Sequence, residues 1–274
     1  DQPRSRGLGD VYKRQPYGRV CHLQPVDWSS GWPVMGNAGE PYWKFRKPKS
    51  DSKTIVNPVE TDEFDSSKLG MQWQWQNDYK ESYGQATSMG FFRLFTYALP
   101  ELGDVSNLWY VPNMLLQKTP ADEFTATTKL SFCSRNSDQY VGLVCMSAEY
   151  SSVGLQRTED GYELQIRHNP NAMRTHLTDE VLTVDTLKPT QKGTPRKGRP
   201  AEMHIKDVYL RMSIKDSKVN YAYSIDGKKW KKAGGEYAMG KGRWIGSKIG
   251  FFAVDPNKTG RKGFIDIDWF RISR

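Results

Sequence analysis

Cysteine is scarce in this chain of 274 residues, and the few cysteines follow no metal-binding or disulfide pattern. Cys21, Cys133 and Cys145 are odd in number, and no Cys-x-x-Cys spacing occurs. A zinc ribbon or a disulfide framework is therefore not expected. Cys133 and Cys145 flank a predicted hairpin turn, which would let them face each other. Buried free thiols are the preferred interpretation, because an unpaired cysteine behaves as a small apolar side chain.

Long apolar runs and helical periodicity are also missing. No run of about 18 apolar residues occurs, so no membrane span is expected. No segment keeps a period of 3.6 residues over ten positions, which predicts almost no helix. Phosphate-binding loops of the GxGxxG or GxxxxGKS/T type are absent, and no Ser-His-Asp triad is suggested. The four histidines show no metal-binding spacing, and His168 and His176 are expected at the surface.

The net charge of +9 is not gathered in the way that a nucleic-acid binder requires. The densest basic run, KPTQKGTPRKGR at 188–199, also contains Pro and Gly and predicts a solvated loop. The other Lys and Arg residues are interspersed with acids, as on an ordinary protein surface. Neither a nucleic acid nor a membrane is expected as a partner.

The first 15 residues, DQPRSRGLGDVYKRQ, are polar and have no apolar core, so they do not read as a signal peptide. They resemble a leader that recurs at the ends of gene fragments from metagenomic assemblies. No initiator Met is present. We therefore expect residues 1–15 to be a non-native, disordered leader and the natural N-terminus to be missing, which leaves localisation unknown from this chain.

Aromatic residues, turn residues and short alternating segments make up the rest of the pattern. Aromatics are 12% of the chain, which also has 24 Gly and 15 Pro, as is typical of a loop-rich β protein. Residues 16–47 predict a β-hairpin too small to fold alone. Residues 48–60 predict a linker, and residues 61–274 predict strands at 71–76, 91–97, 107–111, 124–133, 139–147, 152–156, 162–167, 180–184, 205–215, 219–226, 247–254 and 263–272.

Three hairpin signals join these strands: SRNSDQ at 134–139, KDSK at 215–218 and IDGKKW at 225–230. The last contains Asp226-Gly227, a dipeptide that tight turns favour. Many antiparallel strands without helices predict an all-β fold, specifically a two-sheet β-sandwich or jelly roll.

The stretch GMQWQWQNDY at 70–79 alternates large apolar residues with glutamines. Met71, Trp73 and Trp75 would share one face of a strand, because alternate side chains point to the same side. Two tryptophans on one face could form either a platform on which a sugar ring stacks or a wall of the core. Other aromatics with the same two interpretations are Tyr79, Tyr83, Trp109, Tyr110 and Tyr150.

Two acidic stretches are candidate chemical sites. ETDEFD at 60–65 lacks the paired spacing that glycosidase carboxylates need and adjoins the linker. FIDIDWF at 264–270 puts Asp266 and Asp268 on one strand face. An edge strand with one solvated face is the preferred interpretation. The alternative is a calcium site in which Asp268 joins Asp65 or Asp62, because hard cations need several oxygen ligands.

Several stretches, in their order, resemble one family. GRVCHLQPVDWSSGWPVMG is similar to the closing strands of the five-bladed propeller of glycoside hydrolase family 43, the β-xylosidase and α-L-arabinofuranosidase family. FDSSKLGMQWQWQND, LWYVPNMLLQKTPADEFTATTKLSF, YVGLVCMSAEYSSVGLQR, YSIDGKKW, SKIGFFA and GFIDIDWFRI are similar to its C-terminal concanavalin A-like β-sandwich. The resemblance covers nearly everything from residue 16 onward, and it favours the core-wall interpretation of Trp73 and Trp75.

The resemblance implies that this chain is the end of an inverting glycosidase that acts on plant cell-wall xylo- or arabino-oligosaccharides. The family's catalytic carboxylates lie in the first four propeller blades, so none can be matched here and the chain alone should be inactive. The missing N-terminal propeller would be an intramolecular partner. No cofactor is implied, and secretion or periplasmic residence would be expected from the family.

Two substrate contacts are implied by the same resemblance. Arg19 matches an arginine that reaches the sugar, although a structural salt bridge is the alternative. Tyr150, with Glu149, lies where the family's sandwich sends a loop over the propeller pocket. Two other interpretations of the whole chain stay open: an autonomous carbohydrate-binding module, and a lectin-like or structural domain.

Overall fold

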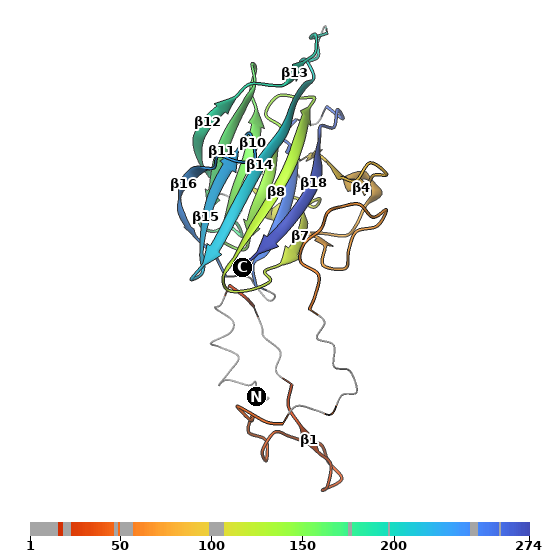
Figure 1. The fold of residues 1–274 in the computed structure, drawn as a ribbon, viewed down its shortest axis with the longest axis vertical. Coiled ribbons are helices and arrows are strands. Elements are labelled where there is room, and N and C mark those ends of the chain that lie inside the picture. The colour runs from red at the N-terminus through yellow and green to blue at the C-terminus, as the bar shows by residue number, and fades with distance from the viewer. Residues whose placement is uncertain are drawn as a thin grey trace.

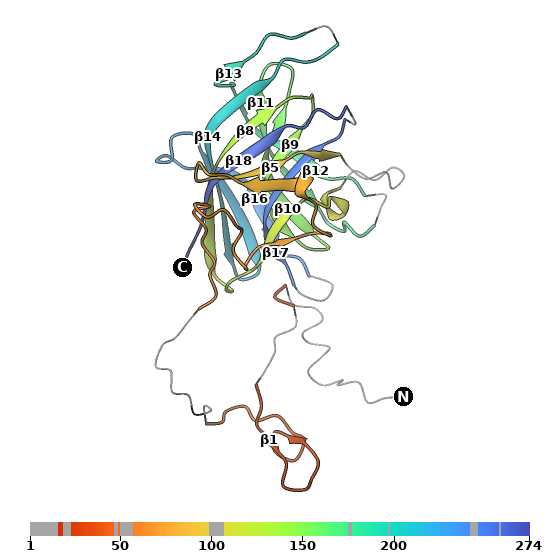
Figure 2. The same cartoon turned by 90° about the vertical axis from the view of Figure 1, so that its right-hand side faces the viewer.

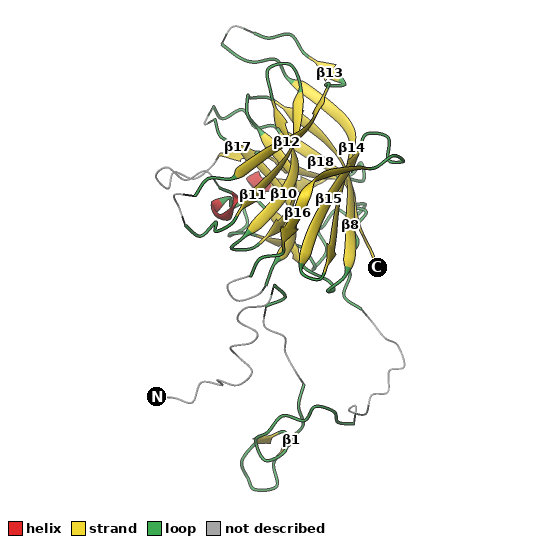
Figure 3. Cartoon of the chain, turned by 90° about the vertical axis from the view of Figure 1, so that its left-hand side faces the viewer, coloured by secondary structure: helices red, strands yellow, loops and turns green. Residues whose placement is uncertain are grey.

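The computed structural model describes residues 16–18, 23–46, 49, 57–98, 107–174, 177–196, 198–241, 246–257 and 259–274. Within these ranges the chain is built almost entirely of antiparallel strands, with two short 3-10 helices, η1 (Glu81–Tyr83) and η2 (Leu108–Tyr110) (Figure 3). No helix in the described ranges is long and apolar enough to cross a membrane. The prediction of an all-β fold is confirmed.

Two sheets of eight strands each face one another as the layers of a sandwich (Figure 1). We name each sheet by a central strand. The β9 sheet has the order β12-β11-β10-β9-β17-β7-β3, and β6 pairs with β17 in parallel. Its strands are β3 (Gln74–Trp75), β6 (Tyr97–Ala98), β7 (Leu115–Lys118), β9 (Tyr140–Met146), β10 (Tyr150–Arg157), β11 (Tyr162–Asn169), β12 (Glu180–Leu187) and β17 (Lys248–Asp255).

The β8 sheet has the order β16-β15-β14-β8-β18-β5-β4, and β13 pairs with β14. Figure 2 looks onto the edge of the sandwich at which the short strands β4 and β5 lie. The strands of this sheet are β4 (Gly84–Ala86), β5 (Phe92–Phe95), β8 (Phe124–Ser134), β13 (Gln191–Lys192), β14 (Met203–Lys215), β15 (Lys218–Ser224), β16 (Lys231–Ala238) and β18 (Phe264–Ser273). A separate hairpin pairs β1 (Val26–Asp27) with β2 (Val34–Met35).

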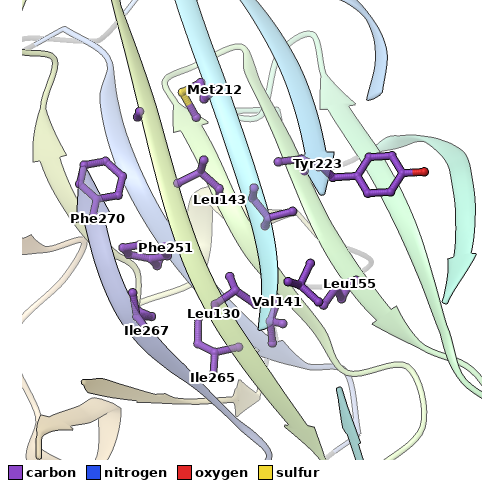
Figure 4. Close-up of a cluster of buried hydrophobic side chains, with 14 of the residues drawn as sticks. Leu130, Val141, Leu143, Leu155, Met212, Tyr223, Phe251, Ile265, Ile267 and Phe270 are labelled. Carbon is purple, nitrogen blue, oxygen red and sulfur yellow. The ribbon is translucent and has the colours of Figure 1, made fainter. Parts of the chain in front are cut away.

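The main core lies between the two sheets and follows from residue alternation. Along most of β8 every second side chain is buried and its neighbours are half-buried, as expected of a strand with one covered face. Leu130 of β8 and Ile267 of β18 meet Leu143 and Phe251 of the opposite sheet in this cluster (Figure 4). Burial of these apolar side chains is the main force that holds the sheets together.

A second, smaller cluster covers the outer face of the β9 sheet. Segment 107–114 crosses this face and buries Leu108 and Met114 against Tyr140 and Phe252. The rings of Tyr140 and Phe252 lie 4.7 Å apart, and the guanidinium of Arg167 lies 3.8 Å from the centre of the Tyr140 ring. Because both of its faces are covered, β9 is buried at every position and reads as a continuous apolar run.

Some strand predictions need correction. Residues 107–111 do not form a strand: they contain helix η2, because the Asn107 side chain accepts a hydrogen bond from the Trp109 amide (3.0 Å) and caps a helical turn. The predicted strands do not include β4, β7, β13 or β16. β18 is not an edge strand, because it lies between β8 and β5.

The two aspartates of β18 form ion pairs with basic side chains of the neighbouring strands. Asp266 accepts two hydrogen bonds from Arg93 (2.7 and 2.8 Å), and Asp268 pairs with Lys129 (2.9 Å). A register shift between Ile267 and Trp269 places Asp268 at a β-bulge.

The free-thiol interpretation and the Asp226-Gly227 turn are confirmed. Cys133 and Cys145 are buried and unpaired on opposite sheets, and burial is the main cause that raises the pKa of each thiol to about 12. Asp226 accepts hydrogen bonds from the amides of Lys229 and Lys228 (2.8 Å each), which lowers the pKa of its carboxyl to about 2. Gly227 has φ of +69°, a conformation that glycine adopts without strain.

Candidate functional site

The described start of the chain docks on one end of the sandwich. We call this the lower end; it comprises residues 119–123, 147–149, 216–217, 239–241 and 246–247, at the bottom of the sandwich in Figure 1. The Tyr17 hydroxyl donates to the carbonyl oxygen of Asp122 (3.2 Å), and the Ser247 amide donates to the carbonyl oxygen of Pro16. Tyr17 is half-buried and packs against the main core. The lower end is therefore where the segment expected to belong to a propeller meets the sandwich.

The turn between β9 and β10 lies at this same end. The Ser247 hydroxyl donates to the carbonyl oxygen of Gly240 (2.6 Å), and the Ala148 amide donates to the carbonyl oxygen of Lys241 (3.4 Å). On its other side, the Ala172 amide donates to the carbonyl oxygen of Ala148 (2.6 Å). Hydrogen bonds thus connect Pro16, through Ser247 and the neighbouring residues Gly240 and Lys241, to the turn that holds Glu149.

Glu149 is part of a charged group on the surface near this turn. His168 of β11 lies between two carboxylates: its Nε2 is 3.2 Å from Glu149 and its Nδ1 is 3.0 Å from Glu180. The imidazole also lies beside the Tyr237 ring, with 5.5 Å between centroids. Its side chain is mostly covered, so His168 is not the freely exposed loop residue that the sequence suggested. Glu149 therefore lies at the lower end with its carboxylate beside His168.

Tyr150 lies in the protein interior and not in an exposed loop, where the resemblance implied a substrate contact. The side chain is fully buried, and its hydroxyl accepts a hydrogen bond from the Leu108 amide (2.9 Å) and donates to Asp179. Burial and the nearby Asp179 raise the pKa of Tyr150. The Tyr150 side chain anchors segment 107–114 to the β9 sheet, and this buried position does not support a contact between Tyr150 and substrate.

The buried carboxyl of Asp179, which accepts the hydrogen bond from Tyr150, makes the stability of the domain depend on pH. Burial raises the pKa of its carboxyl, although hydrogen bonds from Tyr150 and Asn169 (3.0 Å) act in the opposite direction. A raised acid pKa stabilises the folded state below the ordinary carboxyl pKa, and this contribution is lost as the pH rises through the folded value. Asp179→Asn keeps an acceptor oxygen and removes the charge. We expect urea unfolding to show the variant gaining stability relative to the wild type between pH 4 and pH 7. A relative loss of stability over that range would contradict the assignment.

The tryptophan-glutamine stretch contributes to both core and surface. Trp73 is 8% exposed and packs in the main core, and Trp75 is half-buried against Tyr79 and Tyr83. Neither offers an open platform. Met71 is fully exposed, contrary to the predicted inward position, because a turn closed by the hydrogen bond from Trp73 N to Gly70 O (3.1 Å) interrupts the alternation before β3.

The glutamines of this stretch line a surface groove. Gln72 and Gln74 share it with Met71, Gln117, Arg274 and residues 57–60, and its volume is about 630 Å³. Gln117 Nε2 donates to the carbonyl oxygen of Glu60 (3.0 Å), which fixes one wall. The groove has polar side chains and no aromatic ring among its described lining residues.

The three aspartates predicted to bind calcium are not gathered into one site. Asp62 accepts hydrogen bonds from the Trp73 indole (2.7 Å), the Gln72 side chain (3.2 Å) and the Phe64 amide (2.9 Å). Asp65 is exposed, and Asp268 is paired with Lys129 as described above. The carboxylate of Asp62 is thus satisfied by protein donors, and the described residues show no shared oxygen cage.

Among the described residues, one cluster of three metal-capable side chains has its donor atoms within 4.8 Å of one another: Cys133, Glu202 and His204. No spacing pattern in the sequence indicates this cluster, because Cys133 and His204 are brought together only by the register between β8 and β14. Arg19, the other predicted substrate contact, lies outside the described residues.

Comparison with known proteins identifies the fold family. Residues 61–273 match the model of the β-xylosidase C-terminal concanavalin A-like domain. The chain is 27% identical to a β-xylosidase of Formosa agariphila over 92% of this chain and 42% of that protein. It is 24% identical to a non-reducing end α-L-arabinofuranosidase of Bacteroides ovatus over 78% of this chain and 36% of that protein.

Solved structures agree on the fold. A family 43 protein of Bacillus licheniformis aligns with a TM-score of 0.68 at 24% identity and covers 93% of this chain and 47% of its own. A family 43 protein of Bacteroides ovatus aligns with a TM-score of 0.71 at 19% identity, over 95% of this chain and 48% of its own. This chain therefore spans less than half the length of each of these relatives. Because the family model matches most of the chain, the protein belongs to the family of β-xylosidase C-terminal concanavalin A-like domains.

Proposed function

We propose that this chain is the accessory β-sandwich part of a family 43 glycosidase acting on xylo- or arabino-oligosaccharides. In this proposal the sandwich stabilises a catalytic propeller and narrows its substrate pocket from the side. The single observation that carries the proposal is the docking of Pro16 and Tyr17 on the lower end of a domain of this family. The names of the relatives, β-xylosidase and α-L-arabinofuranosidase, support the substrate class.

The β1–β2 hairpin supports the existence of a further packing partner. Its two strands have two residues each, and Trp28, Trp32 and Trp43 around it are 65%, 74% and 97% exposed. A two-stranded hairpin of this size is not stable by itself in water. Clustered exposed aromatics are typical of a surface that another part of a protein covers. We propose that residues 16–47 complete the last blade of the propeller and that 48–60 link this blade to the sandwich.

A second rigid domain has a clear physical use beside such a pocket. An open propeller face lets water reach the sugar, whereas a wall that excludes water strengthens the polar contacts to the substrate. The turn that carries Glu149 is our candidate for that wall, since hydrogen bonds connect it to the docking site of Pro16. Arg19 remains our candidate for a direct sugar contact, because a guanidinium can donate to two hydroxyls at once. We propose that no cofactor is required.

A domain exchange tests the proposal. We would replace the C-terminal domain of the Formosa agariphila β-xylosidase with residues 61–274 of this chain and compare the chimaera with a version that lacks the domain. The chimaera is expected to retain activity on an aryl β-xyloside. Deletion is expected to reduce kcat/KM by about tenfold or more, because small displacements of a substrate-binding site cost that much.

Two matched glutamate variants locate the effect within the chimaera. Glu149→Ala changes the β9–β10 turn at the lower end, and Glu159→Ala changes the β10–β11 turn at the opposite end. We expect Glu149→Ala to lower kcat/KM about fivefold, the equivalent of one hydrogen bond of about 1 kcal/mol. Glu159→Ala is expected to have no effect. Equal effects of the two variants, or an active enzyme without any sandwich, would contradict the proposed wall.

The alternative of an autonomous carbohydrate-binding module is not favoured. Such a module needs exposed aromatic platforms, but Trp73 is buried and Trp75 is half-buried on this sandwich. Calorimetry of the chain with xylan, arabinan and their oligomers is expected to give no binding heat.

A further inference from the structure

Three side chains with metal-binding donor atoms meet on the outer face of the β8 sheet. Cys133 of β8 and His204 of β14 are directly paired across the two strands, so their side chains lie on the same face. Glu202 immediately precedes β14 and reaches the same point. On the other side of Cys133, Phe264 of β18 is its paired neighbour. This cluster has no part in the lower end or in the proposed glycosidase function.

The distances between donor atoms suit a tetrahedral metal ion. His204 Nε2 lies 3.5 Å from Cys133 Sγ and 2.8 Å from Glu202 Oε1. Two ligands bound to zinc at its usual Zn–S and Zn–N lengths, with a tetrahedral angle between them, lie about 3.5 Å apart. The nitrogen–oxygen pair needs to widen by only a few tenths of an ångström, to about 3.3 Å. The same imidazole nitrogen thus faces both the sulfur and the carboxylate oxygen.

Neighbouring residues hold this arrangement. Arg135 Nε donates to the second carboxylate oxygen, Glu202 Oε2 (2.7 Å), which leaves Oε1 directed at His204. The Arg135 guanidinium lies 5.5 Å from the centre of the Phe264 ring. An outer partner that orients a ligating carboxylate in this way is a regular feature of metal sites.

The cluster also has access to solvent. Cys133 and His204 line a surface depression of about 210 Å³ that continues along Ser131 and Lys129. Cys133 itself is buried, whereas the side chains of His204 and Glu202 are partly exposed. A fourth ligand, such as water, can therefore approach from the depression.

We propose that Cys133, His204 and Glu202 bind a zinc ion, with water as the fourth ligand. A thiolate, an imidazole and a carboxylate form a mixed donor set that suits zinc and does not suit calcium or magnesium, which prefer oxygen ligands alone. On binding, the Cys133 thiol releases its proton to solvent, the sulfur–zinc bond forms, and His204 ligates as the neutral imidazole with its proton on Nδ1. The ion cross-links β8 to the start of β14, and with it the end of segment 188–202.

Cobalt titration of the full chain tests the site, because cobalt(II) occupies zinc sites and reports its ligands by absorption. We would use a Cys21→Ser background, freed of metal by a chelator that is then removed. A thiolate-to-cobalt charge-transfer band in the near ultraviolet is expected, together with the visible bands of tetrahedral cobalt, saturating at one ion per chain. Zinc is expected to abolish these bands by displacement, and calcium is expected to leave them unchanged.

Variants assign the ligands. Cys133→Ser is expected to remove the charge-transfer band, and His204→Gln is expected to weaken cobalt binding by on the order of 100-fold or more. Arg135→Gln, which removes the guanidinium that orients Glu202, is expected to weaken binding by about 10- to 100-fold with the band retained. Circular dichroism of each variant establishes that it is folded.

Two control variants replace the same residue types at positions outside the proposed site. Cys145→Ser removes the other described thiol, and His168→Gln removes an imidazole that also lies between carboxylates. Both are expected to leave the titration unchanged. The proposal is overturned if saturating cobalt gives no charge-transfer band, if the band survives Cys133→Ser, or if it depends on Cys145.

Discussion

Trp73→Ala is expected to lower the free energy of unfolding by about 3–5 kcal/mol, the range for removing a buried aromatic side chain. The indole packs on Phe64, Phe251 and Phe270, with ring centroids 5.6, 5.9 and 5.4 Å away. Its nitrogen also donates to Asp62 (2.7 Å), so truncation leaves a carboxylate with one donor fewer in a partly buried position. Urea unfolding followed by fluorescence or circular dichroism measures this loss.

Met71→Ala is the matched control from the same stretch. Met71 is fully exposed, so its truncation is expected to change stability by no more than about 0.5 kcal/mol. Calorimetry with xylo-oligosaccharides should not distinguish either variant from the wild type. If Trp73→Ala kept wild-type stability and weakened sugar binding, the tryptophan would be a sugar platform after all.

Gly142→Val is expected to destabilise the domain by more than about 4 kcal/mol, which would appear as insoluble or unfolded protein. Gly142 of β9 lies opposite Gly154 of β10. A Cβ atom at position 142 would lie 2.1 Å from the carbonyl oxygen of Val153 and 2.5 Å from the Cα of Gly154. These are backbone atoms, so the side chain fits only if the two central strands separate. Solubility and thermal melting measure the effect.

Gly235→Val provides the comparison, since the same substitution is made in strand β16 at the edge of the β8 sheet. Nothing lies within 4 Å of a Cβ placed at Gly235, and its φ is not positive. This variant is expected to stay within about 0.5 kcal/mol of the wild type. Similar melting temperatures for the Gly142 and Gly235 variants would show that close contact of the β9 and β10 backbones is not required.

The long strands were predictable because their residue pattern and their environment agree. β8 and β14 alternate apolar and polar residues over more than ten positions, as a strand with one covered face requires. β16 was missed because its sequence, KKAGGEYA, is polar and rich in glycine and lies mostly exposed at the sheet edge. Segment 107–111 looked like a strand because its apolar residues do face a core, but the Asn107 cap turns it into a helix.

The site was less predictable, because its contacts cross large sequence separations. Tyr150 directly follows the β9–β10 turn at the lower end, as the resemblance implied. Its hydroxyl, however, accepts a hydrogen bond from the amide of Leu108, 42 residues earlier, and no local sequence pattern reveals this contact. Cys133 and His204 are 71 residues apart and meet through strand register alone. The acidic pattern of β18 suggested a cation site, yet the required positive charges come from Arg93 and Lys129 on adjacent strands. Strand pairing, rather than local composition, decides each of these cases.

The most direct test of the central claim is an activity assay of this chain by itself. The claim is that the chain contributes the sandwich and the docking segment of a glycosidase but none of its catalytic carboxylates. The purified chain, incubated with an aryl β-xyloside and an aryl α-L-arabinofuranoside, is expected to release no aryl product above the uncatalysed rate. Measurable turnover that disappears when one of the chain's own carboxylates is replaced by its amide would contradict the claim.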